Sequence, residues 1–96
     1  MIYEWDPRKA ESNLRKRGVS FGQAATVFLD PLAMTFPDPD HSENEDREIT
    51  IGYSMRRQVL FVAHSGRGDR VRIISARRAA RSERKQYEEG ITKANR

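Results

Sequence analysis

Apolar and polar residues alternate along the second half of the chain with the two-residue period of half-buried β-strands. The segment REITIGYSM places Ile49, Ile51 and Tyr53 on one side of such a strand. The short sequences RRQ and GRGD separate this segment from VLFVAHS, and VLFVAHS from RVRIISA. The three segments predict an antiparallel meander, and the shorter stretch AMTF before them predicts one more strand.

The first third of the chain carries helix signals instead. An aspartate and a proline at positions 6–7 combine an N-cap with a proline at the first helical position. The helix that they begin should run to Arg17 and stop at Gly18. Ser20 and Gln23 have the spacing of a capping box, which predicts a second helix ending near Phe28.

These elements predict an α+β fold built on a small, mostly antiparallel four-stranded sheet, with two N-terminal helices and one C-terminal helix. The C-terminal helix is expected at about residues 79–90, and residues 2–5 have the pattern of a short first strand. All helices are expected on one side of the sheet. A chain of 96 residues fits a single domain, residues 1–96.

Composition excludes several classes of protein. The chain has no cysteine, so neither disulfides nor cysteine-based zinc sites are available. No apolar run approaches the roughly 20 residues of a membrane span, and the N-terminus lacks the apolar region of a signal peptide. We therefore expect a soluble, cytoplasmic protein.

Charge is distributed unevenly beneath the formal net charge of +4. Residues 30–48 hold seven acidic residues against one arginine, whereas residues 67–96 hold ten basic residues against four acidic ones. Arginine outnumbers lysine in the second group, and its planar fork suits phosphate. The pattern predicts a basic face that binds polyanions, although a surface of mutually paired charges is the alternative.

The sequence RVRIISARRAARSER contains six arginines in fifteen positions. If the last helix extends back into this segment, Arg77, Arg81 and Arg84 stack along one helix face. Like charges stacked in this way repel each other, so either an acid or an incoming phosphate should offset them. Glu83 and Glu88 are the acids available.

The remaining candidate chemistry is sparse. Arg47 and Glu48 begin the first strand of the meander; Glu48 could form a salt bridge with nearby arginines or act as a proton acceptor. Tyr87 fits the core, but its hydroxyl could also reach the arginines. His41 and His64, with the acidic loop PDPDHSENED, do not have the spacing of a metal site. We expect neither a metal nor a cofactor.

Four segments of the chain closely resemble the BrnT family of type II toxins: WDPRKAESNLRKRGVSFGQAATVFLDP, REITIG, LFVAHS and RVRIISARRAARSERKQYE. The most specific of them is ISAR followed by ER and a tyrosine. The resemblance implies a RelE-like fold and a ribonuclease that inhibits translation. It also implies a cognate, BrnA-like antitoxin that neutralises the toxin and carries the complex to its own promoter DNA. A heterotetramer with two antitoxins fits the family.

The resemblance, with the chemistry of metal-free RNA cleavage, assigns roles by position. In such cleavage the 2′-hydroxyl attacks the adjacent phosphate, and fixed cations stabilise the added negative charge. Glu48 is the candidate general base, Arg72 and Arg77 are phosphate clamps, and Lys9 and Arg84 stabilise charge. Further candidate contacts with RNA are Arg47, Arg84, Arg17, Asn13 and Tyr87.

Arg17 stands where the family has a histidine, in the sequence Lys-Arg-Gly instead of Lys-His-Gly. This departure supports a second hypothesis, a non-catalytic RNA-binding or regulatory module on the same scaffold. A third hypothesis is that the basic face mainly docks an acidic segment of the antitoxin. The third is compatible with an enzyme, because an inhibitor can cover the site that it blocks.

Overall fold

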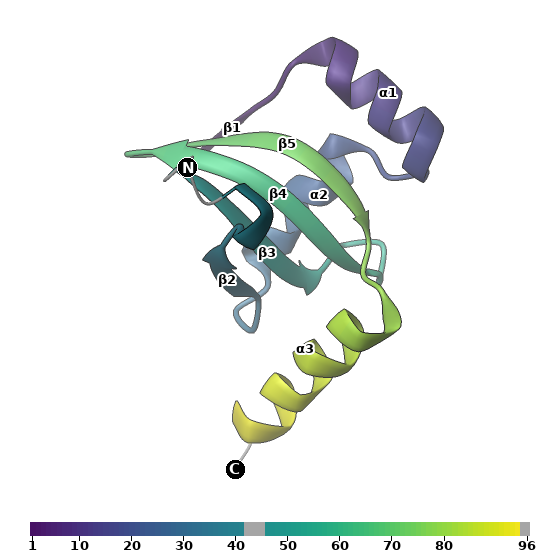
Figure 1. Ribbon diagram of the computed structural model, residues 1–96, viewed down its shortest axis with the longest axis vertical. Helices are drawn as coiled ribbons and strands as arrows, with labels where there is room; N and C mark the ends of the chain where they lie inside the picture. The colour runs from purple at the N-terminus through teal and green to yellow at the C-terminus, as the bar shows by residue number, and fades with distance from the viewer. Residues whose placement is uncertain (42–45, 95–96) are drawn as a thin grey trace.

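The computed structural model describes residues 1–41 and 46–94 and contains a five-stranded mixed sheet (Figure 1). The strands lie in the order β1-β5-β4-β3-β2. β2 to β5 pair antiparallel, whereas β1 pairs parallel with β5. The strand bounds are β1 Ile2–Glu4, β2 Met34–Pro37, β3 Arg47–Tyr53, β4 Val59–Arg67 and β5 Arg70–Arg78.

The prediction of four mostly antiparallel strands holds for β2 to β5 but omits the parallel edge strand. β1 is only three residues long, and its pairing with β5 is anchored where the N–H of Ile2 donates to the carbonyl of Asp69 at 2.8 Å. So short a strand is defined by the partner that it meets rather than by its own pattern. Its alternation therefore indicated that it exists but not where it pairs.

The helices begin and end largely as their caps predict. The helical segments are α1 Pro7–Arg17, α2 Phe21–Ala25, η1 Thr26–Leu29, η2 Pro39–His41 and α3 Arg81–Ala94. The Asp6 carboxylate accepts from the N–H of Arg8, and Gly18 closes α1 in the left-handed region at a φ of 71°. The Ser20 hydroxyl accepts from the N–H of Gln23 at 3.0 Å. The predicted second helix is shorter than expected, because the chain tightens into the 3₁₀ turn η1 after Ala25.

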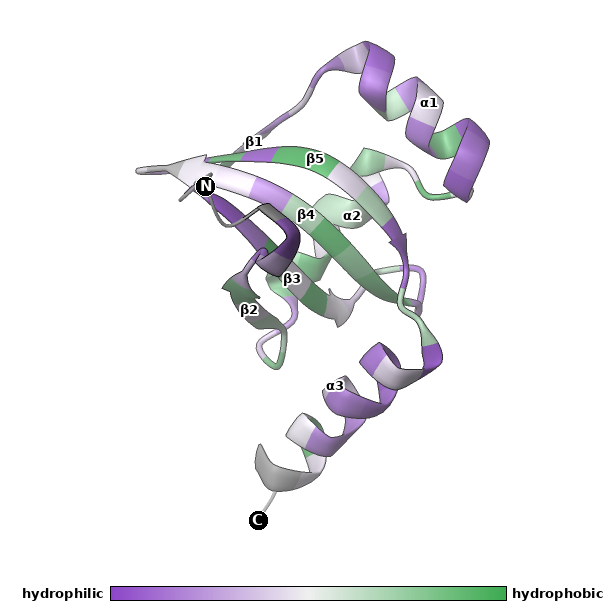
Figure 2. Ribbon diagram, viewed as in Figure 1, coloured by the Kyte–Doolittle hydropathy of each residue, from purple (hydrophilic) through white to green (hydrophobic). Residues whose placement is uncertain are grey.

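Helices cover both faces of the sheet, so the prediction that all of them lie on one side is wrong. On one face, α2 and η1 pack with β4 and β5 around a core of Val19, Phe21, Ala24, Val27, Leu60, Val62, Ile73 and Ala76. On the other face, α3 covers a smaller core of Ile49, Ile51, Ala63 and Tyr87. Figure 2 shows the matching pattern, with apolar residues concentrated in the strands and α2, and mostly polar residues on α1 and α3. In the described part of the chain, no helix is long and apolar enough to cross a membrane.

The last helix begins later than predicted, and this changes the placement of the arginines. β5 remains paired with β4 as far as Arg78, opposite Leu60, so Arg77 lies on a strand. α3 starts only at Arg81. The predicted helical stack of Arg77, Arg81 and Arg84 is therefore wrong, because strand pairing competes with helix formation and wins over this segment.

A β-bulge in β5 sets which side chains share a face. His64 on β4 pairs with Ile73, but the preceding Ala63 pairs with Ser75, so Ile74 is an extra residue on β5. Before the bulge, Arg72 points to the face covered by α3. Simple alternation would then send Arg77 to the opposite face. The extra residue reverses the alternation, so Arg72, Ser75 and Arg77 all lie on the α3 face.

His64 is a buried polar residue on the opposite face, which α2 and η1 cover. It is 5% exposed, its Nε2 lies 2.7 Å from the hydroxyl oxygen of Thr50, and its ring meets Phe28 edge-on. Thr50 in turn lies 2.8 Å from the hydroxyl of Thr35. Burial lowers the pKa of His64 from 6.5 to about 4. The imidazole is therefore neutral and structural at neutral pH.

We expect the fold to lose stability as the pH falls from 6.5 towards 4. In this window the unfolded chain protonates His64 while the folded chain does not, so protonation favours unfolding. The linkage amounts to about 2 kcal/mol between pH 7 and pH 4.5. Urea unfolding at the two pH values should show this loss in the free energy of unfolding, and the His64→Gln variant should lose less between the same two pH values. An equal pH dependence in both proteins would contradict the assignment.

Asp30 ties three elements together beside η1. Its Oδ1 accepts from the N–H of Leu32, and its Oδ2 accepts from the N–H of Tyr53 and from the hydroxyl of Tyr87 at 2.5 Å. Burial opposes ionisation of Asp30, but these hydrogen bonds outweigh it and leave the pKa below its usual value. Burial and Asp30 raise the pKa of Tyr87. Tyr87 on α3 is thus a core residue that anchors its helix, and its hydroxyl does not reach the arginines.

Candidate functional site

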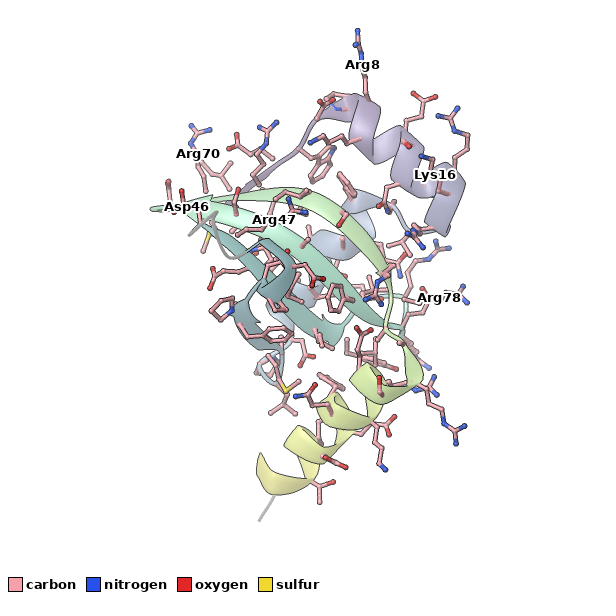
Figure 3. The ribbon with its side chains drawn as sticks, viewed as in Figure 1. Arg8, Lys16, Asp46, Arg47, Arg70 and Arg78 are labelled. Atoms are coloured by element: carbon pink, nitrogen blue, oxygen red, sulfur yellow. The ribbon has the colours of Figure 1, made fainter. Side chains whose placement is uncertain are left out.

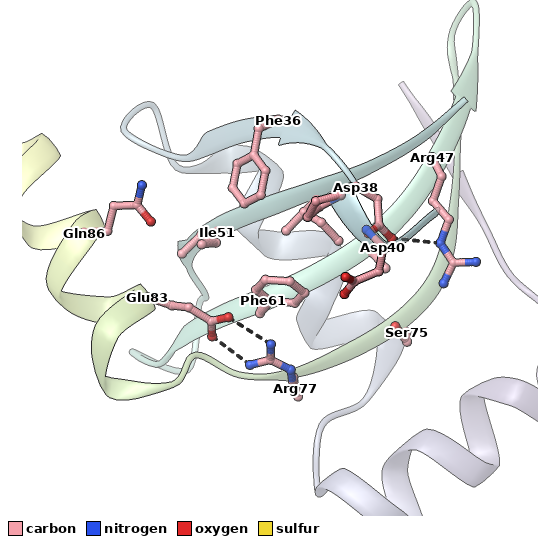
Figure 4. A pocket seen from close by; sticks show the side chains of 13 residues that line it. Phe36, Asp38, Asp40, Arg47, Ile51, Phe61, Ser75, Arg77, Glu83 and Gln86 are labelled. Atoms are coloured by element: carbon pink, nitrogen blue, oxygen red, sulfur yellow. Dashed lines mark hydrogen bonds and ion pairs between the residues drawn. The ribbon is translucent and has the colours of Figure 1, made fainter. Parts of the chain in front are cut away.

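A cleft of about 460 Å³ opens on the α3 face of the sheet, between the strands and the first turns of α3 (Figure 4). Its floor is apolar and includes Phe36, Ile49, Ile51 and Phe61. Its polar lining comes from the η2 segment, β3, β5 and α3: Asp38, Asp40, Arg47, Ser75, Arg77, Glu83 and Gln86. We refer to this space as the sheet cleft.

Arg77 is held rigidly at one side of the sheet cleft. Its two terminal nitrogens donate to the two oxygens of Glu83 at 2.7 and 2.9 Å, and its guanidinium carbon lies 3.9 Å from the centre of the Phe61 ring. These hydrogen bonds, which Arg77 donates and Glu83 accepts, raise the pKa of Arg77 and lower the pKa of Glu83. A guanidinium has five N–H donors, and three of them donate to described residues, the third to the carbonyl of Arg78. Two donors stay available in a fixed orientation.

Glu83 also fixes the start of α3. One of its oxygens accepts from the N–H of Ala80 at 2.6 Å, as the glutamate of a capping box does. The same carboxylate therefore caps the helix and orients Arg77. The local sequence ARRAARSER builds both contacts, because Glu83 is the third residue of the helix and Arg77 precedes the helix by four positions.

Arg47 lies on the other side of the sheet cleft, at the start of β3. Its Nε is 3.2 Å from Oδ2 of Asp38, a carboxylate that is only 7% exposed. Asp40 follows on η2 and is exposed. Among the described residues, its carboxylate makes no hydrogen bond or ion pair, and in the view of Figure 4 it lies between Arg47 and Arg77.

A second, smaller hollow of about 260 Å³ adjoins the sheet cleft at Ser75. It lies between α1 and β5 and is lined by Lys9, Ser12, Asn13, Lys16, Arg17, Ile74 and Ser75. Three of these seven residues are basic and none is acidic, so the hollow favours anions. We call it the α1 groove; Figure 3 shows Lys16 on the helix that forms one of its walls.

Asn13 is a structural residue rather than a free RNA contact. Its amide nitrogen donates to the carbonyls of Val19 and Ala76 at 2.8 and 2.9 Å, and its oxygen accepts from the N–H of Ala76 at 3.1 Å. β1 covers the edge of β5 only as far as Arg72, so Ala76 lies on an open edge. Asn13 bonds to the N–H and the carbonyl of Ala76 on that edge and so attaches α1 to the sheet. α1 lies beside β5 (Figure 1).

Arg72 shares the α3 face but lies outside the sheet cleft. It pairs with Ser65, which pairs with Arg47, so the two arginines stand on one row about 10 Å apart. Arg77 pairs with Phe61, which is four residues from Ser65 along β4, so the Cα atoms of Arg77 and Arg72 are about 13 Å apart. Arg72 is exposed and has no ion pair with a described residue. The two predicted phosphate clamps therefore share a face, but only Arg77 lines the sheet cleft, and their action on one phosphate stays a prediction.

Two further predicted residues lie apart from these arginines. Glu48 pairs with His64 and points to the face covered by α2 and η1, because neighbours along a strand alternate between faces. The prediction that Glu48 works beside Arg72 and Arg77 is wrong on this geometry. Arg84 is exposed on α3 beside Arg81 and Lys85, 3.9 Å from Glu88, and lines a separate surface hollow.

Sequence reasoning missed Lys16, Ser75, Asp38 and Asp40. Ser75 lies inside the ISAR segment, and Lys16 lies two helical turns after the predicted Lys9 on the same side of the helix, so helical spacing could have found it. The two aspartates belong to a loop whose composition shows only that it is acidic. Its residues 42–45, including Glu43 and Glu45, lie outside the described part of the chain.

Comparisons with known proteins agree with this fold. Residues 5–83 match the family described as the ribonuclease toxin, BrnT, of type II toxin-antitoxin systems. The 1.1 Å crystal structure of the Brucella abortus ribonuclease toxin BrnT is similar, with a TM-score of 0.65 and 24% sequence identity. The match covers 84% of this chain and all of that one. A search of curated proteins found no match. The expected likeness to RelE stays a prediction.

Proposed function

Because the chain belongs to the BrnT family of ribonuclease toxins of type II toxin-antitoxin systems, we propose that it cleaves RNA around Ser75, where the sheet cleft meets the α1 groove. This placement rests on one observation: three elements bring their basic side chains to the two hollows. Lys9, Lys16 and Arg17 come from α1, Arg47 from β3 and Arg77 from β5. A phosphate near Ser75 would be approached by cations from both sides of the β5 edge.

In the proposed reaction, the 2′-hydroxyl attacks the neighbouring phosphorus and the bond to the 5′-oxygen breaks. The products are a 2′,3′-cyclic phosphate and a 5′-hydroxyl, whose oxygen takes its proton from water as it leaves. Arg77 contributes the two N–H donors that Glu83 and the carbonyl of Arg78 leave free. Because Glu83 and Phe61 already fix the guanidinium, it needs little reorganisation when negative charge develops on the phosphate.

Asp40 replaces Glu48 as the proposed proton acceptor for the 2′-hydroxyl. Of the described carboxylates in the sheet cleft, Glu83 is bound to Arg77 and Asp38 is paired with Arg47, whereas that of Asp40 is uncommitted. Lys9 and Arg47 stabilise charge, and Arg72 and Arg84 contact parts of the RNA farther from the scissile bond. This division follows from the distances between the arginines.

We expect RNA cleavage by the purified protein to be unchanged by EDTA. Guanidinium and ammonium groups supply the positive charge in this proposal, so chelating divalent cations removes nothing that the reaction needs. The measurement is gel analysis of total RNA with and without EDTA, followed by identification of the cyclic phosphate ends. Loss of cleavage in EDTA, restored by added metal, would contradict the charge assignment.

The same assay tests the alternative of a non-catalytic RNA-binding module, which Arg17 in place of the family histidine favours. Such a module would retain RNA without cutting it, with an affinity that falls steeply as salt is raised. We extend the proposal to the effect of cleavage in the cell and to the partner of the toxin. We propose that cleavage inhibits translation in the cytoplasm and that a cognate antitoxin, in a heterotetramer that binds its own promoter DNA, neutralises the toxin.

A further inference from the structure

Four large hydrophobic residues are exposed together at the end of the sheet where β3 stops. Leu29 is 70% exposed, Met55 73%, Tyr53 45% and Leu32 38%. They come from two segments that are distant in sequence, the end of η1 with the connection to β2, and the end of β3 with the turn that follows. We call them the end patch. A gathering of exposed apolar side chains at one place on a small protein marks an interaction surface.

The end patch surrounds a preformed hollow of about 360 Å³. Leu29, Pro31, Tyr53 and Met55 supply its apolar lining. Two hydrogen bonds hold the segments in place: the N–H of Tyr53 donates to Asp30 and that of Met55 donates to the hydroxyl of Thr26, each at 2.9 Å. The hollow can therefore accept an apolar side chain without prior rearrangement of the backbone.

The charge around the hollow is positive and uncommitted. Arg57 lines it, and Arg56 precedes Arg57 in the same turn. Neither arginine has an ion pair with any residue in the described ranges. The one carboxylate in the lining, Asp30, already accepts three hydrogen bonds. The surface thus favours a partner that combines an apolar side chain with an acidic one.

We propose that the end patch docks a segment of the cognate antitoxin, with an apolar side chain in the hollow and a carboxylate beside Arg57. This rests on the proposed function only in requiring a protein antitoxin, as type II systems have. Tyrosine, methionine and arginine are enriched in the cores of protein interfaces, and aliphatic side chains offer little to RNA. A dimer through the end patch would bring Arg56 and Arg57 of both copies into one interface, which like charge disfavours.

The end patch shares no residue with the sheet cleft or the α1 groove. Docking and RNA cleavage are therefore separable by mutation. An antitoxin anchored here must extend another segment over the groove in order to block it, so the end patch supplies affinity rather than direct inhibition.

The test measures binding of the purified full-length toxin to the purified product of the neighbouring antitoxin gene by calorimetry. Met55→Asp and Leu29→Asp should each weaken the affinity at least about 10-fold, since they place a charge in the hollow. Arg57 has a φ of 63°, so Arg57→Asn keeps a residue that tolerates this conformation. That variant should weaken binding and reduce its salt dependence. Leu14→Asp, at a 52% exposed site on α1, is the matched control and should bind normally.

Thermal melting and RNA cleavage are measured on the same proteins. Unchanged melting and cleavage with weakened antitoxin binding support the proposal. Wild-type affinity in both patch variants overturns it, and so does an equal loss in Leu14→Asp. A toxin dimer that Met55→Asp dissociates, with antitoxin binding intact, assigns the end patch to self-association and overturns it as well. Failure of the wild-type toxin to cleave RNA would refute the proposed activity but would leave this binding result standing.

Discussion

Replacing Arg77 by alanine is expected to lower the rate of RNA cleavage by about 100- to 1,000-fold, the usual effect of removing one preorganised charge-stabilising donor. Arg77 is the arginine whose orientation is fixed from two sides, by Glu83 and by the Phe61 ring. Single-turnover cleavage of a defined RNA measures the loss directly. Growth arrest on expression should disappear in parallel.

The Arg77 variant must be shown to fold, because the pair with Glu83 also contributes to stability. Both side chains are partly exposed, so breaking the pair should lower the free energy of unfolding by only about 1 kcal/mol. Arg81→Ala is the matched control, since Arg81 is an exposed arginine four residues later on α3. Full activity in a folded Arg77→Ala protein would refute the assigned role, and an equal loss in Arg81→Ala would indicate a general effect of charge.

Replacing Asn13 by alanine is expected to destabilise the fold by about 3 kcal/mol, because three hydrogen bonds of about 1 kcal/mol each are lost. For a domain of this size, the melting temperature should fall by about 15 °C. α1 buries no residue completely, so this amide is its main specific attachment to β5. Calorimetric or circular dichroism melts measure the change.

Ser12→Ala serves as the control for Asn13. Ser12 is the preceding residue, lines the same α1 groove and makes no hydrogen bond within the described chain. Its replacement should leave the melting temperature unchanged. Weaker RNA binding by Asn13→Ala at an unaltered melting temperature would restore Asn13 as an RNA contact and contradict the structural role.

Local signals predicted the local structure well. The caps at Asp6, Ser20 and Gly18 set the helix ends because capping depends on residues a few positions apart. The alternation of Ile49 and Ile51 predicted β3 for the same reason, but not that Thr50 on the other side is buried as well or that Tyr53 is exposed. The parallel pairing of β1 with β5 and the second covered face depend on contacts between distant segments, which no short pattern contains.

The candidate site was predicted in composition but not in arrangement. Resemblance and charge selected Arg47 and Arg77, which line the sheet cleft, and Lys9, which lines the adjoining α1 groove; their chemical roles stay predictions. The extra residue Ile74 decides which arginines share a face, and a bulge has no reliable signature in a single sequence. Glu48 failed for a simpler reason: it is adjacent to Arg47 in sequence, and adjacent strand residues point in opposite directions.

The double use of Glu83 links two properties that are normally independent. Its carboxylate is bound both to the backbone of Ala80 and to the guanidinium of Arg77, so fraying of the first helical turn must release the arginine as well. By thermodynamic reciprocity, a phosphate that drew Arg77 away from Glu83 would weaken the turn to the same extent. The start of the C-terminal helix and the orientation of Arg77 are therefore coupled through a single side chain.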